Sequence, residues 1–144
     1  MEELKNKEIG FLFKKIDEKL AKNVNEMLET IGITFPQQRV LGFINDFPNH
    51  TTTQKEIELF LDVSHPSTNG IIRRLEEKKL VTTEHTTKNG RMSKNVTLTE
   101  AGIKICEENA VDREVMENRF RQWLTPEEYD AFEKILVKLY RQLS

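Results

Sequence analysis

The feature that most constrains this chain is a change in its hydrophobic period near residue 80. Before this point apolar residues recur every three or four positions, as on an amphipathic helix, whereas residues 81–98 alternate with a period of about two. The alternating stretch surrounds Asn89-Gly90, a dipeptide that favours a two-residue type I′ turn between antiparallel strands. We therefore expect several helices followed by a β-hairpin.

Two short helices joined by a tight turn come directly before this hairpin. Thr53 and Glu56 have the spacing of a capping box for the first helix, and Ser64 is the expected N-cap of the second. Only a few residues separate the two helices, which is the connection found in a helix-turn-helix. A helix-turn-helix followed by a hairpin forms a winged helix, which we assign to residues 51–98.

Long amphipathic helices are expected on both sides of this module. Residues 4–31 place apolar side chains three and four positions apart without a proline, and residues 99–121 and 126–143 show a similar pattern. A shorter helix has Pro36 in its first turn, where a missing N–H group costs little. The expected fold is mainly α with a small β-hairpin wing (α+β), a winged helix-turn-helix in the order ααααββαα.

The flanking helices need a partner for their apolar faces. No Gly/Ser-rich linker divides the chain, so we expect one domain over residues 1–144. The winged lobe at residues 51–98 is complete by itself, and a two-fold dimer would allow the remaining apolar stripes to bury each other. We therefore expect a homodimer, with residues 1–31 and 99–144 as its helical dimerisation region.

The charge of the chain is unevenly distributed. With 22 Lys+Arg and 24 Asp+Glu the formal net charge is -2, which excludes a polybasic protein that coats nucleic acid indiscriminately. Residues 64–98, however, contain 7 basic and 3 acidic residues, and the segments on either side each carry a net charge of -3. Because the basic excess lies on the second helix of the helix-turn-helix and on the hairpin, double-stranded DNA is the expected partner.

The second helix of the helix-turn-helix begins with short polar side chains, at the end that enters the major groove. Asn69 can bond an adenine edge through both amide atoms, Gly70 allows close approach to DNA, and Arg91 in the hairpin can reach the minor groove. Lysines beside it can bind phosphate. The candidate DNA-binding residues are Thr53, Ser64, His65, Pro66, Ser67, Thr68, Asn69, Arg73, Arg74, Lys88, Arg91 and Lys94.

Ordinary structural roles also fit several of these residues. Ser64, Ser67 and Thr68 are equally suited to capping the helix, and Asn89-Gly90 is first of all a turn. Arg73 and Arg74 can form ion pairs with the acidic residues that follow them, in a run of charges over residues 76–79 that is typical of a solvated face. The sequence leaves both readings open.

With these residues identified, the chain resembles the MarR family of bacterial winged-helix regulators over nearly its whole length. Residues 33–41 are similar to the Leu-Thr-x-x-Gln-x-x-x-Leu start of the family's second helix, residues 63–76 to its recognition helix, and residues 96–102 to the Leu-Thr-x-x-Gly segment after the wing. The resemblance implies a homodimeric transcription regulator, usually a repressor, that binds a pseudopalindromic operator with one recognition helix per half-site. It also implies frequent release from DNA by small aromatic ligands.

The chain departs from the family pattern at two places. The family wing usually carries Asp-x-Arg, whereas Gly90 and Met92 occupy those positions here and Arg91 lies one residue early. We expect Arg91 to enter the minor groove, with Lys88 as the second choice. The family also tends to have glycine after the recognition helix, where this chain has Lys79, so the lysine must adopt a left-handed conformation or the helix must continue.

A small aromatic effector would fit a cleft between the terminal helices and the winged lobe. Aromatic residues at helical spacing are more often part of a core than of a pocket, and the sequence does not distinguish these roles. The candidate ligand-binding residues are Phe11, Phe13, Phe43, Phe47 and Met116.

Three other classes of function fit the sequence less well. Cys106 could make the chain a redox-responsive regulator, but Glu107 and Glu108 follow it and oppose thiolate formation. A winged helix that binds only proteins would lack the basic surface. An enzyme is not expected, because the chain has no nucleophile–base pairing and no Gly-rich phosphate loop. One Cys and three scattered His offer no metal site, and no cofactor, membrane span or signal peptide is expected, which favours the cytoplasm.

Overall fold

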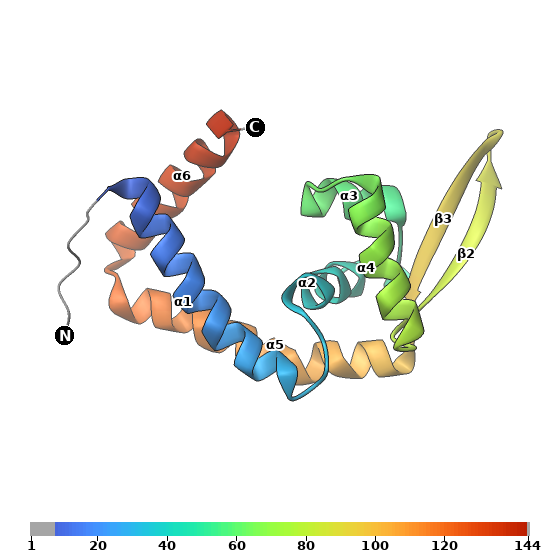
Figure 1. Cartoon of the computed structure of the whole chain (residues 1–144), viewed down its shortest axis with the longest axis horizontal. Coiled ribbons are helices and arrows are strands. Elements are labelled where there is room, and N and C mark those ends of the chain that lie inside the picture. The colour runs from blue at the N-terminus through green and yellow to red at the C-terminus, as the bar shows by residue number, and fades with distance from the viewer. Residues whose placement is uncertain (1–7, 144) are drawn as a thin grey trace. The chain divides into compact units, whose positions relative to one another are not determined.

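The structure, a computed structural model, describes residues 8–143, with the side chains of Met27 and residues 109–115 excepted. The chain forms two compact units, residues 1–103 and residues 104–144. Its elements are, in order, α1 (Ile9–Glu29), α2 (Phe35–Asn45), the 3-10 turn η1 (Pro48–His50), β1 (Thr51–Thr53), α3 (Gln54–Leu61), α4 (His65–Glu77), β2 (Val81–Lys88), β3 (Arg91–Leu98), α5 (Glu100–Trp123) and α6 (Pro126–Leu143) (Figure 1). The expected fold class is confirmed, with the helices and the hairpin in the predicted order.

The structure adds a third strand that the sequence did not indicate. Strand β1 pairs with β3 in an antiparallel ladder from Thr51 opposite Thr97 to Thr53 opposite Asn95, so the sheet has the order β1-β3-β2. Three successive threonines are too short a run to show a period of two. The expected order therefore contains no strand before α3.

The hairpin follows the register that its turn requires. Val81 lies opposite Leu98 and Lys88 opposite Arg91, which leaves Asn89-Gly90 as the two-residue turn. Both turn residues have a positive φ, 55° for Asn89 and 75° for Gly90, as a type I′ turn demands. The sequence prediction of the hairpin is confirmed.

The core of the first unit lies between the sheet and helices α2, α3 and α4. These helices present amphipathic faces to one another, and their fully buried side chains are large and aliphatic. Side chains that are less than 2% exposed include Val40, Leu41, Ile44, Ile57, Ile72, Leu75, Val81 and Val96.

Local capping fixes where the helices begin. The Thr34 hydroxyl accepts a hydrogen bond from the Gln37 N–H at 3.4 Å, and the Gln37 side chain accepts one from the Thr34 N–H at 3.2 Å, which completes a capping box at α2. Thr53 caps α3 by accepting from the Glu56 N–H at 3.2 Å. Both helix starts lie where the sequence predicted them.

Helix α4 ends in a tight turn at Lys79. The Leu80 N–H donates to the Leu75 carbonyl at 3.0 Å and the Lys79 N–H donates to the Glu76 carbonyl at 2.9 Å, the two bonds of a Schellman motif. Lys79 has a φ of 62°, a left-handed conformation that costs an L-residue roughly 1–2 kcal/mol. The sequence left two alternatives, a left-handed Lys79 or a longer helix. The structure shows the first, in which the helix ends and Lys79 has a strained backbone.

The chain returns to this turn when it leaves the hairpin. The Leu80 carbonyl accepts from the Thr99 N–H at 3.0 Å, and the Thr99 hydroxyl donates to the Lys79 carbonyl at 2.8 Å. The start of α5 is so close that a Cβ added at Gly102 would lie 2.3 Å from the Leu80 carbonyl oxygen. Residue 102 must therefore be glycine, because a side chain would collide with the Leu80 carbonyl.

The second unit comprises the larger part of α5 and all of α6. Thr125 and Glu128 form a reciprocal capping box at α6, with bonds of 2.9 and 3.1 Å. The Tyr129 hydroxyl donates to Glu117 at 3.0 Å, and this bond to a carboxylate raises the pKa of Tyr129 above its usual value.

The apolar face of α6 is uncovered in the structure. None of its described residues is buried, and the sequence predicts that a second copy of the chain covers this stripe. The exposed side chains on it include Phe132, Ile135, Leu136, Leu139, Tyr140 and Leu143. In the described part of the chain, no helix is both long enough and apolar enough to cross a membrane.

Replacing Gly102 with alanine should destabilise the fold by about 1–3 kcal/mol, because the new methyl group meets a backbone oxygen that cannot rotate away. Gly10→Ala is the matched control, since a Cβ at Gly10 has no atom within 4 Å and alanine favours a helix. Urea denaturation monitored by circular dichroism measures both changes. A Gly102→Ala protein as stable as the parent would contradict the close packing.

Candidate nucleic-acid interface

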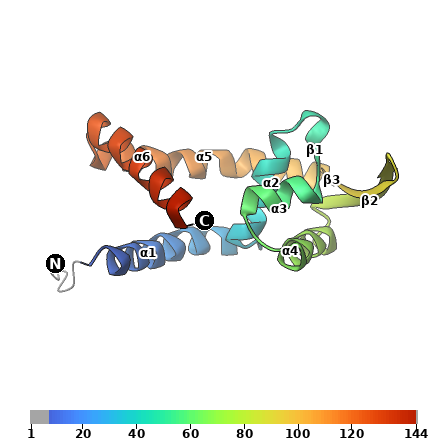
Figure 2. The same ribbon diagram turned by 90° about the horizontal axis from the view of Figure 1, so that it is seen from above.

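The helix-turn-helix is formed by α3 and α4, which are joined by three residues. Asp62 ends α3 in a left-handed conformation with a φ of 55°, and its N–H donates to the Glu58 carbonyl at 2.9 Å. Viewed from above, the hairpin of β2 and β3 projects beyond α2, α3 and α4 (Figure 2). The recognition helix and the wing are thus both presented by the first unit.

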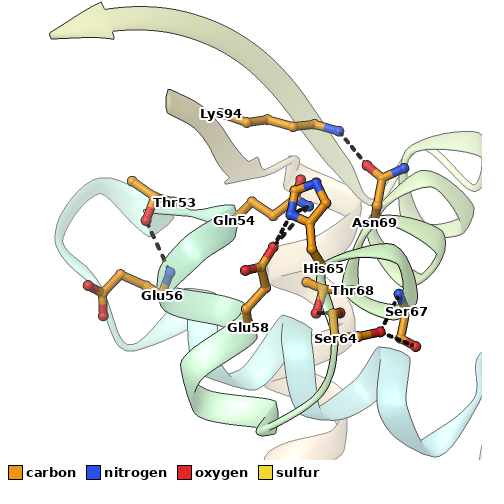
Figure 3. Close-up of polar contacts among 10 residues, drawn as sticks. All are labelled: Thr53, Gln54, Glu56, Glu58, Ser64, His65, Ser67, Thr68, Asn69 and Lys94. Carbon is orange, nitrogen blue, oxygen red and sulfur yellow. Dashed lines mark hydrogen bonds and ion pairs between the residues drawn. The ribbon is translucent and has the colours of Figure 1, made fainter. Parts of the chain in front are cut away.

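The first turn of α4 is held by the cap that the sequence predicted. The Ser64 hydroxyl accepts from the Ser67 N–H at 3.3 Å and donates to the Ser67 hydroxyl at 2.9 Å (Figure 3). Both serines and Pro66 are exposed. Capping therefore leaves these side chains accessible to a partner, and their role in DNA binding stays a prediction.

Thr68 does not face outward. Its side chain is 0% exposed, and its hydroxyl donates to the Ser64 carbonyl at 3.0 Å. A fully buried side chain cannot touch DNA, so the assignment of Thr68 as a DNA-binding residue was wrong. Residue 68 lies four positions before Ile72 and seven before Leu75, which is the spacing of one helix face, so its position indicates burial although its side chain is polar.

His65 is connected to α3 at the start of the recognition helix. Its Nδ1 atom contacts Oε1 of Glu58 and lies 3.2 Å from Nε2 of Gln54 (Figure 3). Gln54 is 4% exposed, whereas the His65 side chain is 72% exposed. Two α3 residues, Gln54 and Glu58, therefore contact one edge of the ring, and the other edge is open to solvent. The sequence pattern did not identify either residue.

Asn69 links the recognition helix to the wing. Its Oδ1 atom accepts a hydrogen bond of 3.3 Å from Nζ of Lys94 on β3 (Figure 3). An amide oxygen has two lone pairs and the amide nitrogen keeps its hydrogens, so Asn69 can still bond a base edge. The two predicted DNA-binding residues come from segments 25 positions apart in the chain and lie side by side.

The arginines of α4 are exposed at its middle. Arg73 lies 3.9 Å from Glu77, with both side chains more than 60% exposed, and such a surface pair contributes little stability. The guanidinium of Arg74 passes beside Gly70, at 3.8 Å from the position that a Cβ would occupy there. Among the described residues, no strong contact prevents either arginine from binding a partner molecule.

The wing tip presents the remaining basic residues. Lys88 and Arg91 lie opposite each other across the Asn89-Gly90 turn, and both are exposed. Met92 is 77% exposed beside them. Thr53 lies apart from this tip, half-buried at the start of α3, where its hydroxyl is engaged as the cap.

The C-terminal end of α4 carries a contact that the sequence did not predict. Nζ of Lys78 donates to the Gly32 carbonyl and to Oε1 of Gln37, each at 2.7 Å. The sequence predicts a solvated face over residues 76–79, which does not describe Lys78 completely. A partner more than 40 positions away leaves no local signal in the sequence.

The predicted effector residues are only partly brought together. The rings of Phe43 and Phe47 meet edge to face with centroids 5.0 Å apart, and Phe60 stacks on Phe43 at 4.2 Å. Phe11 instead lies under Lys15, with the ammonium 5.4 Å from the ring centroid. Phe13 is 41% exposed on α1 and Met116 belongs to the second unit, so the cleft itself stays a prediction.

Comparisons with known proteins agree with this description. A protein-family model described as MarR family matches residues 31–92. The MepR–DNA complex of Staphylococcus aureus is similar to this chain with 27% sequence identity and a TM-score of 0.88, over 96% of this chain and 100% of that one. A search of curated proteins finds no match.

Two further solved structures share the fold at lower identity. AbsC, a MarR family transcriptional regulator from Streptomyces coelicolor, is 19% identical with a TM-score of 0.86, over 99% of this chain and 98% of that one. BpsR from Bordetella bronchiseptica, whose DNA binding is regulated by 6-hydroxynicotinic acid, is 21% identical with a TM-score of 0.80, over 97% and 98%.

Replacing Gly70 with alanine should raise stability and weaken DNA binding together. Alanine gains roughly 1 kcal/mol of helix propensity, and the new methyl group has only an ordinary contact with Arg74. The same methyl group lies on the exposed face of α4 and should hinder close approach to DNA. Thermal melts and fluorescence anisotropy on a bound duplex measure the two effects, and unchanged affinity would place Gly70 outside the interface.

Proposed function

We propose that this chain, a winged-helix DNA-binding transcription regulator of the MarR family, acts as a homodimeric repressor on a pseudopalindromic operator. The observation that supports this most is the basic surface of α4 and the wing, which consists of the exposed residues Arg73, Arg74, Lys88 and Arg91 and the half-buried pair Asn69 and Lys94. An α-helix fits the major groove of B-DNA, and a wing beside it reaches the backbone or the minor groove.

The side chains on this surface differ in chemistry, and we assign them different roles in DNA binding. Arg91 and Lys88 at the wing tip carry full positive charges, so they suit phosphate or the negative potential of the minor groove. Asn69 and Ser67 in the first turns of α4 suit base edges, since amides and hydroxyls form directional hydrogen bonds. Specific recognition therefore belongs to the start of α4, and most of the salt-dependent affinity belongs to the wing.

A dimer is supported by the uncovered face of α6. Phe132, Ile135 and Leu139 lie at helical spacing on this face and are 48%, 52% and 38% exposed. Phe132 and Ile135 also border a shallow apolar hollow of about 350 Å³ with Leu124, Glu128 and Ala131. A second copy of the same helix can fill such a hollow, since a two-fold axis brings identical surfaces together.

Release by a small aromatic ligand is the second part of the proposal. BpsR, which shares the fold, is regulated by 6-hydroxynicotinic acid. Phe43, Phe47 and Phe60 form an aromatic cluster in this chain, with the Arg39 guanidinium 5.6 Å from the Phe60 ring centroid. Stacking and a cation suit a planar acid. Such a ligand acts only if it binds the free and DNA-bound conformations with different affinity.

A redox role for Cys106 is less favoured by its surroundings. The side chain is 5% exposed, and oxidation selects accessible thiolates. The proposed regulator acts on double-stranded DNA in the cytoplasm and uses neither catalysis nor a cofactor.

Arg91→Ala should weaken binding to all duplexes and reduce the slope of log affinity against log salt by about 1, because one phosphate contact is lost. Asn69→Ala should instead cost about 1–3 kcal/mol at particular base pairs and relax the preference there. Fluorescence anisotropy on a selected operator and on a scrambled duplex separates the effects. Lys104→Ala, an exposed lysine on α5, is the control.

A triple alanine variant can contradict the assignment of this surface as the DNA interface. If Arg73, Arg91 and Lys94 are all replaced by alanine and affinity for the selected operator is unaltered, the basic surface is not the DNA interface.

Replacing Ile135 and Leu139 with aspartate should convert the dimer to monomers, because charges would be buried where apolar side chains meet. Sedimentation equilibrium at micromolar concentration measures the association. The control replaces Lys134 and Lys138 on the same helix with glutamate. A double aspartate variant that stays dimeric would show that another surface holds the two copies together.

A further inference from the structure

A polar cluster lies where the recognition helix begins. It consists of Gln54 and Glu58 on α3 and His65 at the first position of α4 (Figure 3). Nε2 of Gln54 is 3.3 Å from Oε1 of Glu58 and 3.2 Å from Nδ1 of His65. The Glu58 side chain is 22% exposed and that of His65 is 72% exposed, so the cluster opens to solvent on the histidine side.

The Glu58 contact assigns the hydrogen on Nδ1. A carboxylate oxygen only accepts, so the His65 Nδ1–H and the Gln54 amide both donate to Glu58, and the Gln54 nitrogen 3.2 Å from Nδ1 is then a neighbouring donor and not a hydrogen-bond partner of the ring. Nδ1 therefore carries a hydrogen in either charge state of the ring. Nε2 is the nitrogen left for a partner, and it accepts when the ring is neutral and donates when the ring is protonated.

The charged groups around the ring come from two elements. Glu58 faces it from α3, and Lys94 on β3 lies nearby, bound to Asn69 one helical turn after His65 (Figure 3). Glu56 points away from the ring on the other side of α3 (Figure 3). A DNA phosphate at the exposed edge would be a second anion on the ring, and only a protonated imidazole donates to an anion on both sides.

We propose, building on the proposed DNA-binding function, that Glu58 is a positioning residue that holds His65 so that Nε2 binds the phosphate backbone of the operator. His65 takes up one proton from solvent when the complex forms. Affinity then increases as the pH falls through the range in which histidine gains a proton, about pH 8 to 5. Glu58, although an anion, favours DNA binding through the ring that it orients.

A double-mutant cycle tests this role in the full-length protein. Wild type, His65→Ala, Glu58→Ala and the double variant are titrated with the selected operator at pH 6 and pH 8 at constant salt. The wild type should bind about tenfold more tightly at pH 6, the magnitude of one charge-assisted hydrogen bond. His65→Ala should lose this difference, and since His50 and His85 are present in both proteins, the loss belongs to His65.

The sign of the Glu58 effect distinguishes positioning from simple electrostatics. In the wild-type background Glu58→Ala should weaken binding at pH 6, whereas in the His65→Ala background it should leave affinity unchanged or raise it, because a carboxylate near phosphate is removed. Glu58→Gln keeps an acceptor oxygen and should recover part of the affinity. Glu56→Ala, on the same helix but pointing away, is the matched control.

Several outcomes would overturn the inference. Glu58→Ala lowering affinity equally in both backgrounds would show a structural role, and a His65→Ala protein with the wild-type pH dependence would show that the proton binds elsewhere. If Glu58→Ala fails to fold, Glu58→Gln carries the same comparison. A wild-type protein that binds no duplex refutes the proposed function instead, so the two failures are distinguishable.

Discussion

The turn at the end of α4 is the constraint on which the DNA-binding lobe depends. Its left-handed residue, Lys79, stops the recognition helix and sends the chain into β2. The carbonyls that the turn exposes, those of Lys79 and Leu80, then hold Thr99 as the chain leaves β3. The recognition helix, the wing and the start of α5 therefore share one junction. Gly102 packs directly against the Leu80 carbonyl at this junction. Because no room remains between them, one of these elements cannot shift without the others.

Much of this lobe is predictable because it is specified by short-range signals. The capping residues Thr34, Thr53 and Ser64 fix helix starts through bonds to residues three positions away, and the Asn89-Gly90 turn fixes the register of the hairpin. Each of these signals is contained within a few residues. These signals determine the fold class and the order of the helices and the hairpin. They also indicate which side of the molecule carries the basic charge.

The remainder depends on contacts between distant segments. Strand β1 exists only because β3 is beside it, and the Gln54–Glu58–His65 cluster requires the angle between two helices. Thr68 was misassigned for a different, local reason: its hydroxyl satisfies a carbonyl in its own helix and its methyl group joins the core, so its polar side chain does not indicate exposure. Its spacing of four and seven positions from Ile72 and Leu75 is that of one helix face and does indicate burial.

The ammonium group of Lys78 gives the recognition helix a fixed end. It binds the carbonyl that follows α1 and the side chain that caps α2, so one charge joins the termini of three helices. The opposite end of α4, with His65 and Ser67, is exposed. Because α4 is anchored at its C-terminal end, a small rotation of the helix about that end would displace its N-terminal turn most strongly. The residues proposed to contact bases, Ser67 and Asn69, therefore lie in the part of the helix that such a rotation would move most.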